Sequence, residues 1–180
     1  MSAGRVTSAL AICRVLLVLC VVMGCSGCGY RFIGSTDQRL APDQSLWVAF
    51  IGNDTVSPTA QTVIRRALLD VSHAQRGMKP AGSESEAMIV VTGALRSYTT
   101  TAISYTAADR AREYRLLINV ELEVRRKGTA APLWKGMLQA FQDYPANDNL
   151  ALQRNSEEAA LAAASTVLAQ RFLVTVEQSY

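Results

Sequence analysis

The chain has 180 residues, of which 49% are hydrophobic and only 18% are charged, so it holds enough apolar material for one domain with a core. Its formal net charge of +3 is far from the strong cationic excess of nucleic-acid-binding proteins, and no nucleic-acid partner is expected. Because no cysteine follows residue 28, the rest of the chain is expected to have no disulfide, no cysteine-based metal site and no thiol nucleophile.

Residues 1–24 have the composition of a secretion signal. Arg5 lies in a short basic region, and residues 15–23 form an apolar stretch. This stretch is too short to span a bilayer as a stable helix, and it ends in small residues, which is typical of a segment that a peptidase removes. We therefore predict a signal peptide over residues 1–24.

Two cysteines that follow the apolar stretch are candidate lipidation sites. Val22-Met-Gly-Cys25 resembles the bacterial lipobox, in which a small residue precedes the cysteine that receives a diacylglyceryl group. Cys28 is the alternative, although the residue three positions before it is a cysteine, which fits the lipobox poorly. Ser26 resembles the second mature residue of lipoproteins that are sent to the outer membrane. Several acyl chains would anchor the protein permanently, because each buried methylene adds about 0.8 kcal/mol.

After a lipid anchor and linker over residues 25–44, we predict a single periplasmic domain over residues 45–180. Residues 45–51 combine β-branched and aromatic side chains and end in a turn, which is typical of a strand. Ser57 and Pro58 then predict a helix start, with serine as the N-cap and proline at the first helical position. Apolar residues recur at helical spacing until Gly77, which suits a C-terminal cap.

A threonine- and tyrosine-rich run follows the next predicted strand. A polar loop is expected over residues 79–86 and a strand over residues 88–95, with weaker strand character continuing to Tyr105. The run Tyr98-Thr-Thr-Thr-Ala-Ile-Ser-Tyr105 is too polar for a core. It has two interpretations: a strand extension that faces a partner, or a plain exposed loop.

The clearest pattern in the chain lies between Tyr114 and Arg125. Apolar residues alternate with mostly polar ones along this whole segment. A period of two over that length indicates a half-buried antiparallel strand with one wet face. A turn at residues 126–129 leads to a second apolar segment over residues 133–141, which favours a hairpin.

A long final helix is predicted to begin at Asn155 as the N-cap, with acidic residues in its first turn. Its buried stripe would contain Leu161, Ala164, Leu168 and Phe172. The order strand, helix, three strands, helix predicts an α+β fold. In the simplest arrangement, two helices pack on one face of a four-stranded mixed sheet (β-α-β-β-β-α).

The order of these elements after a lipidated cysteine resembles the LPS-assembly lipoprotein family LptE. The resemblance covers nearly the whole mature chain and is carried by five short motifs. They are Cys28-Gly-Tyr-Arg-Phe32, Val48-Ala-Phe-Ile-Gly-Asn-Asp-Thr55, Ala111-Arg-Glu-Tyr-Arg-Leu116, Leu133-Trp134 and Glu157-Glu-Ala159. The second is similar to a Phe-x-Asn-x-Thr strand end, with Ile51 in the phenylalanine position. In this family the cysteine before Gly-Tyr is usually the lipidated one, which corresponds to Cys28.

The resemblance implies an outer-membrane lipoprotein that faces the periplasm, plugs an LptD-type β-barrel, helps that barrel to assemble and binds lipopolysaccharide. The implied partners are the barrel, lipopolysaccharide and the membrane, with no covalent chemistry and no cofactor. One alternative is a lipoprotein subunit of another envelope lipid-transport complex. A second alternative is an enzyme, but no nucleophile, paired-carboxylate or metal-spacing motif supports it. The single histidine, His73, lies near a helix end and is expected to be a surface residue.

Two basic clusters are the candidate contacts for lipopolysaccharide phosphates. One is Arg125, Arg126 and Lys127, where guanidinium and ammonium groups would project from a hairpin end. The other is Arg112 and Arg115, together with Arg110. Each has a simpler interpretation as a set of solvated charges that keeps a strand edge from aggregating.

Overall fold

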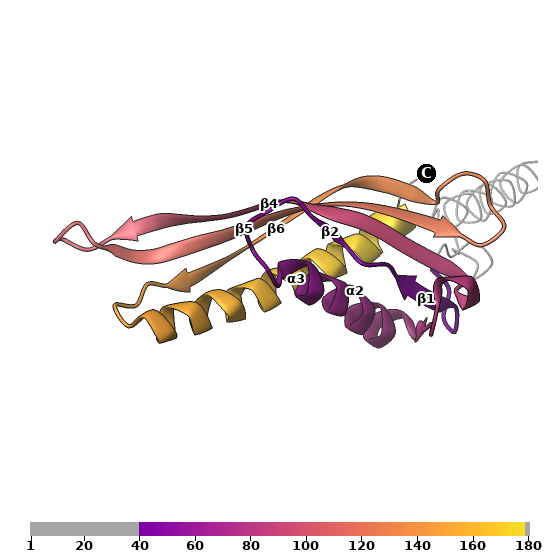
Figure 1. The fold of residues 1–180 in the computed structure, drawn as a ribbon, viewed down its shortest axis with the longest axis horizontal. Helices are drawn as coiled ribbons and strands as arrows, with labels where there is room; N and C mark the ends of the chain where they lie inside the picture. Colours follow the sequence, from indigo (N-terminus) through magenta and orange to yellow (C-terminus); the bar gives the residue numbers. More distant parts are fainter. Residues whose placement is uncertain (1–39, 179–180) are drawn as a thin grey trace, which may run out of the picture. The chain divides into compact units, whose positions relative to one another are not determined.

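Three long antiparallel strands form the centre of the computed structural model, which describes residues 40–178 (Figure 1). They are β4 (Ile89–Tyr105), β5 (Ala111–Arg126) and β6 (Trp134–Pro145), paired in the order β4-β5-β6. The hairpin of β4 and β5 extends beyond the end of β6. The predicted signal peptide and both candidate lipidation sites, Cys25 and Cys28, lie outside the described residues.

Shorter parallel strands line the other edge of β4. β1 (Ser45–Val48) pairs with the start of β4, and β3 (Lys79–Pro80) pairs with β1. β2 (Gly52–Asn53) pairs with β4 further along. The predicted mixed sheet of four strands is thus confirmed, and β2 and β3 add two residues each. These two strands were not predicted because a pair of residues shows no alternation in the sequence.

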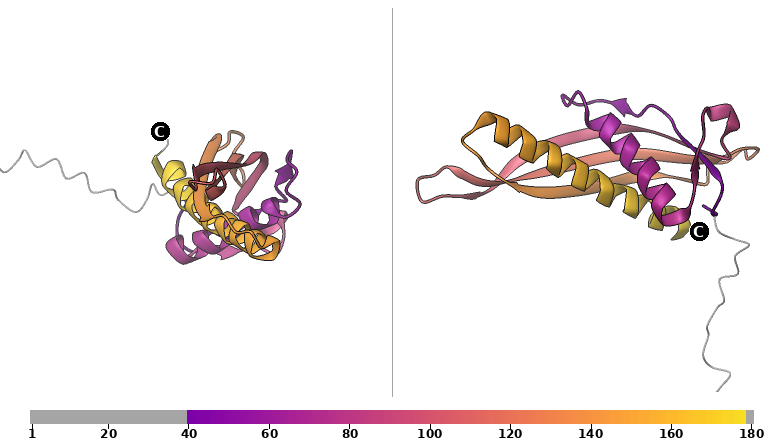
Figure 2. Two further views of the ribbon diagram at one scale, coloured as in Figure 1. Left: turned by 90° about the vertical axis from the view of Figure 1, so that its left-hand side faces the viewer. Right: turned by 90° about the horizontal axis from the view of Figure 1, so that it is seen from below.

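Both helices cover the same face of the sheet, as predicted (Figure 2). α2 (Ala60–Arg76) begins two residues later than Pro58, and Thr59 is its N-cap. The predicted start at Ser57 was wrong because the Ser57 carbonyl accepts a hydrogen bond from Asn53 Nδ2 at 2.6 Å and belongs to the preceding loop. Gly77 ends the helix in the left-handed conformation (φ +66°), which confirms the predicted cap.

The final helix, α3 (Leu150–Gln178), begins five residues before the predicted cap at Asn155. Asn149 is the N-cap, since its Oδ1 accepts hydrogen bonds from the amides of Ala151 (2.9 Å) and Leu152 (3.3 Å). α3 is long and apolar enough to cross a membrane, but half of its most apolar stretch is buried inside the domain. Its composition therefore fits a core helix, and its predicted buried stripe is confirmed (Leu161, Ala164, Leu168, Phe172).

The core lies between the helices and one face of the sheet. Alternate residues of β5, from Leu116 to Val124, are fully buried on that face, which confirms the predicted half-buried strand. Phe172 of α3 packs edge-on against Trp134, with ring centroids 6.2 Å apart. No helix within residues 40–178 covers the opposite face of the sheet, which carries the charged residues of β5 and β6. We call it the open face.

Candidate functional site

The predicted phosphate-binding cations lie in two clusters at opposite ends of β5. Arg110, Arg112 and Arg115 lie where the β4–β5 hairpin turns, and we call them the hairpin cluster. Arg125, Arg126 and Lys127 lie at the β5–β6 turn, and we call them the turn cluster. Arg125 follows Arg112 by thirteen positions of extended strand, or roughly 40 Å at the usual rise per residue. The two clusters are therefore separate candidate sites.

The hairpin cluster is itself divided between the two faces of the sheet. Arg112 and Arg115 are three positions apart in a strand, so their side chains point to opposite faces. Arg115 lies on the open face, where its Nε and Nη2 donate to the two carboxylate oxygens of Asp143 at 2.6 and 2.7 Å. Its guanidinium also lies 4.5 Å from the centre of the Phe141 ring. Arg115 is thus engaged within the sheet, and it lowers the pKa of the Asp143 carboxyl.

Arg112 lines a cavity of about 670 Å³ at the hairpin end of the domain. The walls come from the start of β5, from residues 146–148 and from Gln153 in the first turn of α3. Arg110 also lines it and forms an exposed ion pair with Asp148 at 3.4 Å. The exposed Arg112 side chain has no hydrogen bond or ion pair to any residue in the range 40–178. A cation without a partner at a cavity wall can accept an anionic group from outside.

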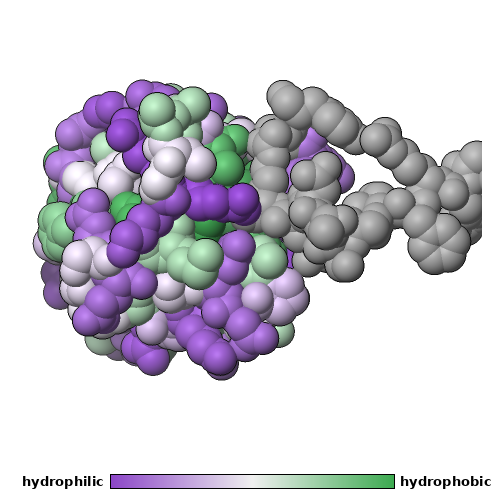
Figure 3. All heavy atoms as spheres, turned by 90° about the vertical axis from the view of Figure 1, so that its right-hand side faces the viewer, coloured by the Kyte–Doolittle hydropathy of each residue, from purple (hydrophilic) through white to green (hydrophobic). Residues whose placement is uncertain are grey.

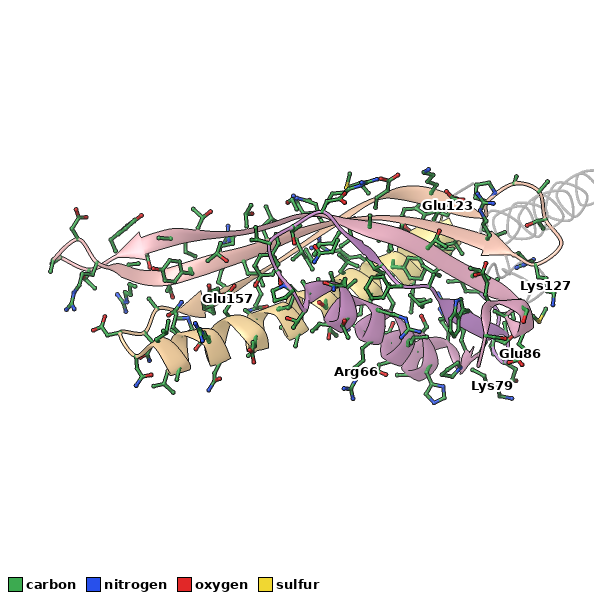
Figure 4. All side chains as sticks on the ribbon, in the orientation of Figure 1. Arg66, Lys79, Glu86, Glu123, Lys127 and Glu157 are labelled. Carbon is green, nitrogen blue, oxygen red and sulfur yellow. The ribbon has the colours of Figure 1, made fainter. Side chains whose placement is uncertain are left out.

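Tyrosines lie beside this cavity, between the hairpin and α3. The Tyr98 hydroxyl donates to Glu157 Oε1 at 2.6 Å, and burial together with this carboxylate raises the pKa of Tyr98. Tyr114 stacks on Tyr144 with ring centroids 5.7 Å apart, and Tyr114 also lines the cavity. The Tyr98 contact joins the hairpin to the first half of α3, and the tyrosine stack joins β5 to β6 beside the cavity. Figure 4 shows Glu157 on that half of α3, far from Lys127.

In contrast to Arg112, Arg125 and Lys127 of the turn cluster have partners within the domain. Arg125 forms an ion pair with Glu123, and the Lys127 ammonium donates to the Ser85 carbonyl at 2.6 Å. Arg126 is half-buried. A second cavity, of about 710 Å³, lies here, and Glu84 and Glu123 line it along with the three cations. Figure 3 faces this end and shows hydrophilic residues spread among paler hydrophobic ones.

On the open face, most of the other charged side chains of the long strands form ion pairs with one another or with Asp54. Arg96 of β4 donates to Glu121 at 2.7 Å and also contacts Asp54. Lys135 of β6 lies 3.7 Å from Glu121 and 3.4 Å from Glu123. The Arg96 and Arg125 contacts lower the pKa of Glu121 and Glu123, respectively. The open face therefore carries paired opposite charges and is not a basic patch.

The other sequence candidate, His73, is an exposed residue of α2. Its Nδ1 lies 2.9 Å from the Met78 carbonyl, just after the end of the helix. Among residues 40–178, no group of three or more His, Cys, Asp and Glu side chains could hold a metal ion.

Sequence reasoning missed the polar residues that surround the hairpin cluster. Asp143 and Asp148 lie beyond the predicted end of β6, and Gln153 lies before the predicted start of α3. The available signals were the alternation that continues past Phe141 and the capping pattern around Asn149.

Comparison with known proteins identifies a family. The family model described as "LptE: Lipopolysaccharide-assembly" matches residues 44–175. No curated protein matches the sequence closely enough to identify a relative.

Solved structures share the fold at low sequence identity. A protein from Xanthomonas campestris is 13% identical with a TM-score of 0.53, covering 79% of this chain and 90% of that one. A candidate lipoprotein from Caulobacter crescentus is 12% identical with a TM-score of 0.52, covering 73% and 87%. A hypothetical protein from Chlamydia trachomatis is also 12% identical with a TM-score of 0.52, covering 75% and 96%.

Proposed function

The chain belongs to the LptE lipopolysaccharide-assembly family, and from this premise we propose that it is an outer-membrane lipoprotein that plugs an LptD-type β-barrel and helps it to assemble for lipopolysaccharide transport to the cell surface. The match over residues 44–175, almost the whole folded domain, carries the proposal. The proposed mechanism is occupancy: the domain fills the barrel lumen and offers groups to the lipid, without covalent catalysis.

The N-terminal region would hold the domain at the membrane. We propose that residues 1–24 are removed, that Cys25, or alternatively Cys28, is acylated, and that residues 25–44 link the anchor to a periplasmic domain. The lipobox pattern supports this arrangement. Mass spectrometry of the native protein would identify the acylated cysteine, and an unmodified N-terminus or an intact leader would contradict it.

Purification of the tagged chain tests the main proposal. We expect an LptD-type barrel to remain bound through detergent extraction, and depletion of the chain to reduce lipopolysaccharide at the cell surface. Recovery of an ABC-transporter or another envelope lipid-transport complex instead would favour the alternative function. Unchanged surface lipopolysaccharide after depletion would contradict the proposed role.

We place the lipopolysaccharide contact at Arg112. Its guanidinium has five donors in a planar fork that matches phosphate, and phosphates are the charged groups of lipid A. The hairpin cavity beside it has room for a phosphate and sugar. In contrast, Arg115 is held by Asp143, and in the turn cluster Arg125 and Lys127 have partners within the domain.

Substitution of Arg112 by alanine tests this placement. We expect lipopolysaccharide binding to weaken by about tenfold or more, because hydrogen bonds to charged groups contribute roughly 1.5–3 kcal/mol. The control is Arg66→Ala, since Arg66 is an exposed arginine on α2, paired only with Asp70 in an i,i+4 bridge. Equal binding by both variants would move the contact away from Arg112, and Arg125→Ala and Lys127→Ala would then test the turn cluster.

A further inference from the structure

The outer edge of β4 from Ser97 to Tyr105 has no strand beside it within residues 40–178. β1 pairs with β4 at residues 89–91 and β2 at residues 94–95, and the Asp54 amide makes the last contact, to the Leu95 carbonyl at 3.0 Å. β5 pairs with β4 along the whole of its other edge. The threonine- and tyrosine-rich run is therefore a strand with one free edge. The interpretation of this run as a loop was wrong.

The chain leaves this edge because of Asn53. Its Oδ1 accepts hydrogen bonds from the amide (3.0 Å) and the hydroxyl (2.7 Å) of Thr55, and its Nδ2 donates to the Ser57 carbonyl. These bonds bend residues 54–57 away from β4 and toward α2. This hydrogen-bonded turn thus ends β2 after two residues, and the β4 edge beyond Leu95 is left without a neighbouring strand.

The register shows which backbone groups the free edge presents. The Leu95 carbonyl faces β2, and a register shift between Leu95 and Ser97 inserts one extra residue into β4. From there on, Thr99 and Thr101 direct their amides and carbonyls toward β5, opposite Leu117 and Arg115. The intervening residues direct theirs outward (Tyr98, Thr100, Ala102). No hydrogen bond within residues 40–178 engages those outward groups.

The free edge lacks the features by which proteins usually prevent edge pairing. Its nine residues include no charge and no proline, and β-branched and aromatic residues are common among them. The other outer strand, β6, is protected. Arg171 of α3 donates to the Gln139 carbonyl at 2.7 Å, Gln142 donates to the Asp143 carbonyl at 3.1 Å, and Pro145 ends the strand. One fold thus blocks one edge and leaves the other able to accept a strand.

We propose that the β4 edge from Ser97 to Tyr105 accepts an extended, uncharged segment of the LptD-type barrel as an additional β-strand. This inference rests on the proposed function. Main-chain hydrogen bonds to Tyr98, Thr100 and Ala102 would hold the segment, as in other cases of strand addition. An uncharged segment fits because the edge itself carries no charge, and the neighbouring Arg96 and Asp54 already pair with each other.

A second copy of the chain is the less suitable occupant. A stable interface typically needs 20–30 residues from each side, and a nine-residue edge supplies fewer than half of these. A strand that belongs to a larger partner surrounding the domain meets this requirement, because other contacts share the interface. The run has the composition of an aggregation-prone segment, so we expect a partner to cover it in the cell.

Hydrogen exchange in the full-length lipidated chain, free and in its complex with the co-expressed barrel, tests the proposal. In the free chain, the amides of Tyr98, Thr100 and Ala102 should exchange much faster than those of Thr99 and Thr101, which face β5. In the complex, the outward amides should slow by at least tenfold, so that the alternation disappears. Outward amides that remain fast in a complex that does form would overturn the inference alone.

Proline substitution provides the second measurement. Thr100→Pro removes one outward amide that has no partner within the domain, so the fold should persist, as circular dichroism would verify. We expect at least tenfold lower barrel retention for Thr100→Pro, equivalent to about 1.4 kcal/mol. Retention should be normal for Thr100→Val, which keeps the amide, and for Met137→Pro on the protected β6 edge.

Three results would count against the proposal. Equal retention by Thr100→Pro and the wild-type chain would overturn strand addition while leaving the proposed function intact. Failure of the wild-type chain itself to retain the barrel would overturn the proposed function, and with it the occupant named here. Protection of the outward amides in the free chain that grows with concentration, together with a dimer mass, would assign the edge to a second copy.

Discussion

Asn53 illustrates how one side chain determines the geometry of a functional edge. It donates to Gln61 on α2 at 2.9 Å and to the Ser57 carbonyl, while its Oδ1 accepts two hydrogen bonds from Thr55. No other residue type of this size supplies two donors and an acceptor at one position. Asn53 therefore connects the end of β2 to the start of α2.

Substitution of Asn53 by alanine should reduce the free energy of unfolding by about 1–3 kcal/mol, because part-buried partners lose their hydrogen bonds. Asn53→Asp keeps the acceptors for Thr55 but loses both donors, so an intermediate loss is expected. Urea denaturation of both variants measures these losses. An unchanged midpoint for Asn53→Ala would show that backbone pairing of β2 alone holds the loop.

The arginines show what a list of residues in the sequence leaves undecided. The sequence identified Arg112 and Arg115 as one cluster, but strand alternation separates them, and Asp143 of β6 binds only Arg115. The alternation was visible in the sequence, so the separation could have been predicted. The pairing with Asp143 could not, because it depends on the register between β5 and β6.

At the scale of elements, Gly93 sets the closest approach between β4 and β5. A Cβ at Gly93 would lie 2.2 Å from the Glu121 carbonyl oxygen and 2.7 Å from Leu122 Cδ2, and a backbone atom cannot move away easily. Gly93→Ala should therefore destabilise the domain by about 1–3 kcal/mol or more, the usual cost of overpacking. Gly52→Ala is the matched control, because its Cβ would meet only ordinary contacts, with Ala94 Cβ at 3.4 Å.

Thermal unfolding of the two glycine variants measures this difference. We expect a clear fall in the melting temperature for Gly93→Ala and little change for Gly52→Ala. Equal melting temperatures would mean that β4 and β5 can separate locally without cost, which the continuous pairing of these strands argues against.

The elements that the sequence predicted well are those with a long, uninterrupted period. β5 alternates over its whole length, and the buried stripe of α3 repeats over several turns, so both were identified with the correct inward faces. The boundaries were less accurate because local hydrogen bonds set them. Asn149 starts α3 early, and Asn53 delays α2. The free edge of β4 needed the structure, because it depends on where a neighbouring strand ends.

At the scale of the whole domain, the two faces of the sheet are stabilised differently. The helix-covered face is held by burial of apolar side chains, which does not depend on pH. The open face is held in part by ion pairs in which arginines lower the pKa of three carboxyls, Asp143, Glu121 and Glu123. The acid response of the domain should therefore report on the open face.

The sign of that response follows from the pKa shifts. A carboxyl whose pKa is lower in the folded state than the unfolded value of about 4 stabilises the fold above that pH, and the stabilisation is lost as pH falls through the folded pKa. We expect the urea midpoint to stay constant from about pH 7 to 5 and to fall modestly below about pH 4, because exposed pairs contribute little.

High salt should make this fall in the urea midpoint shallower, because salt screens the ion pairs. Asp143→Asn should remove part of it, since Arg115 then has no carboxylate partner. A midpoint that rises on acidification would show that repulsion among the carboxyls outweighs their contacts with Arg96, Arg115 and Arg125.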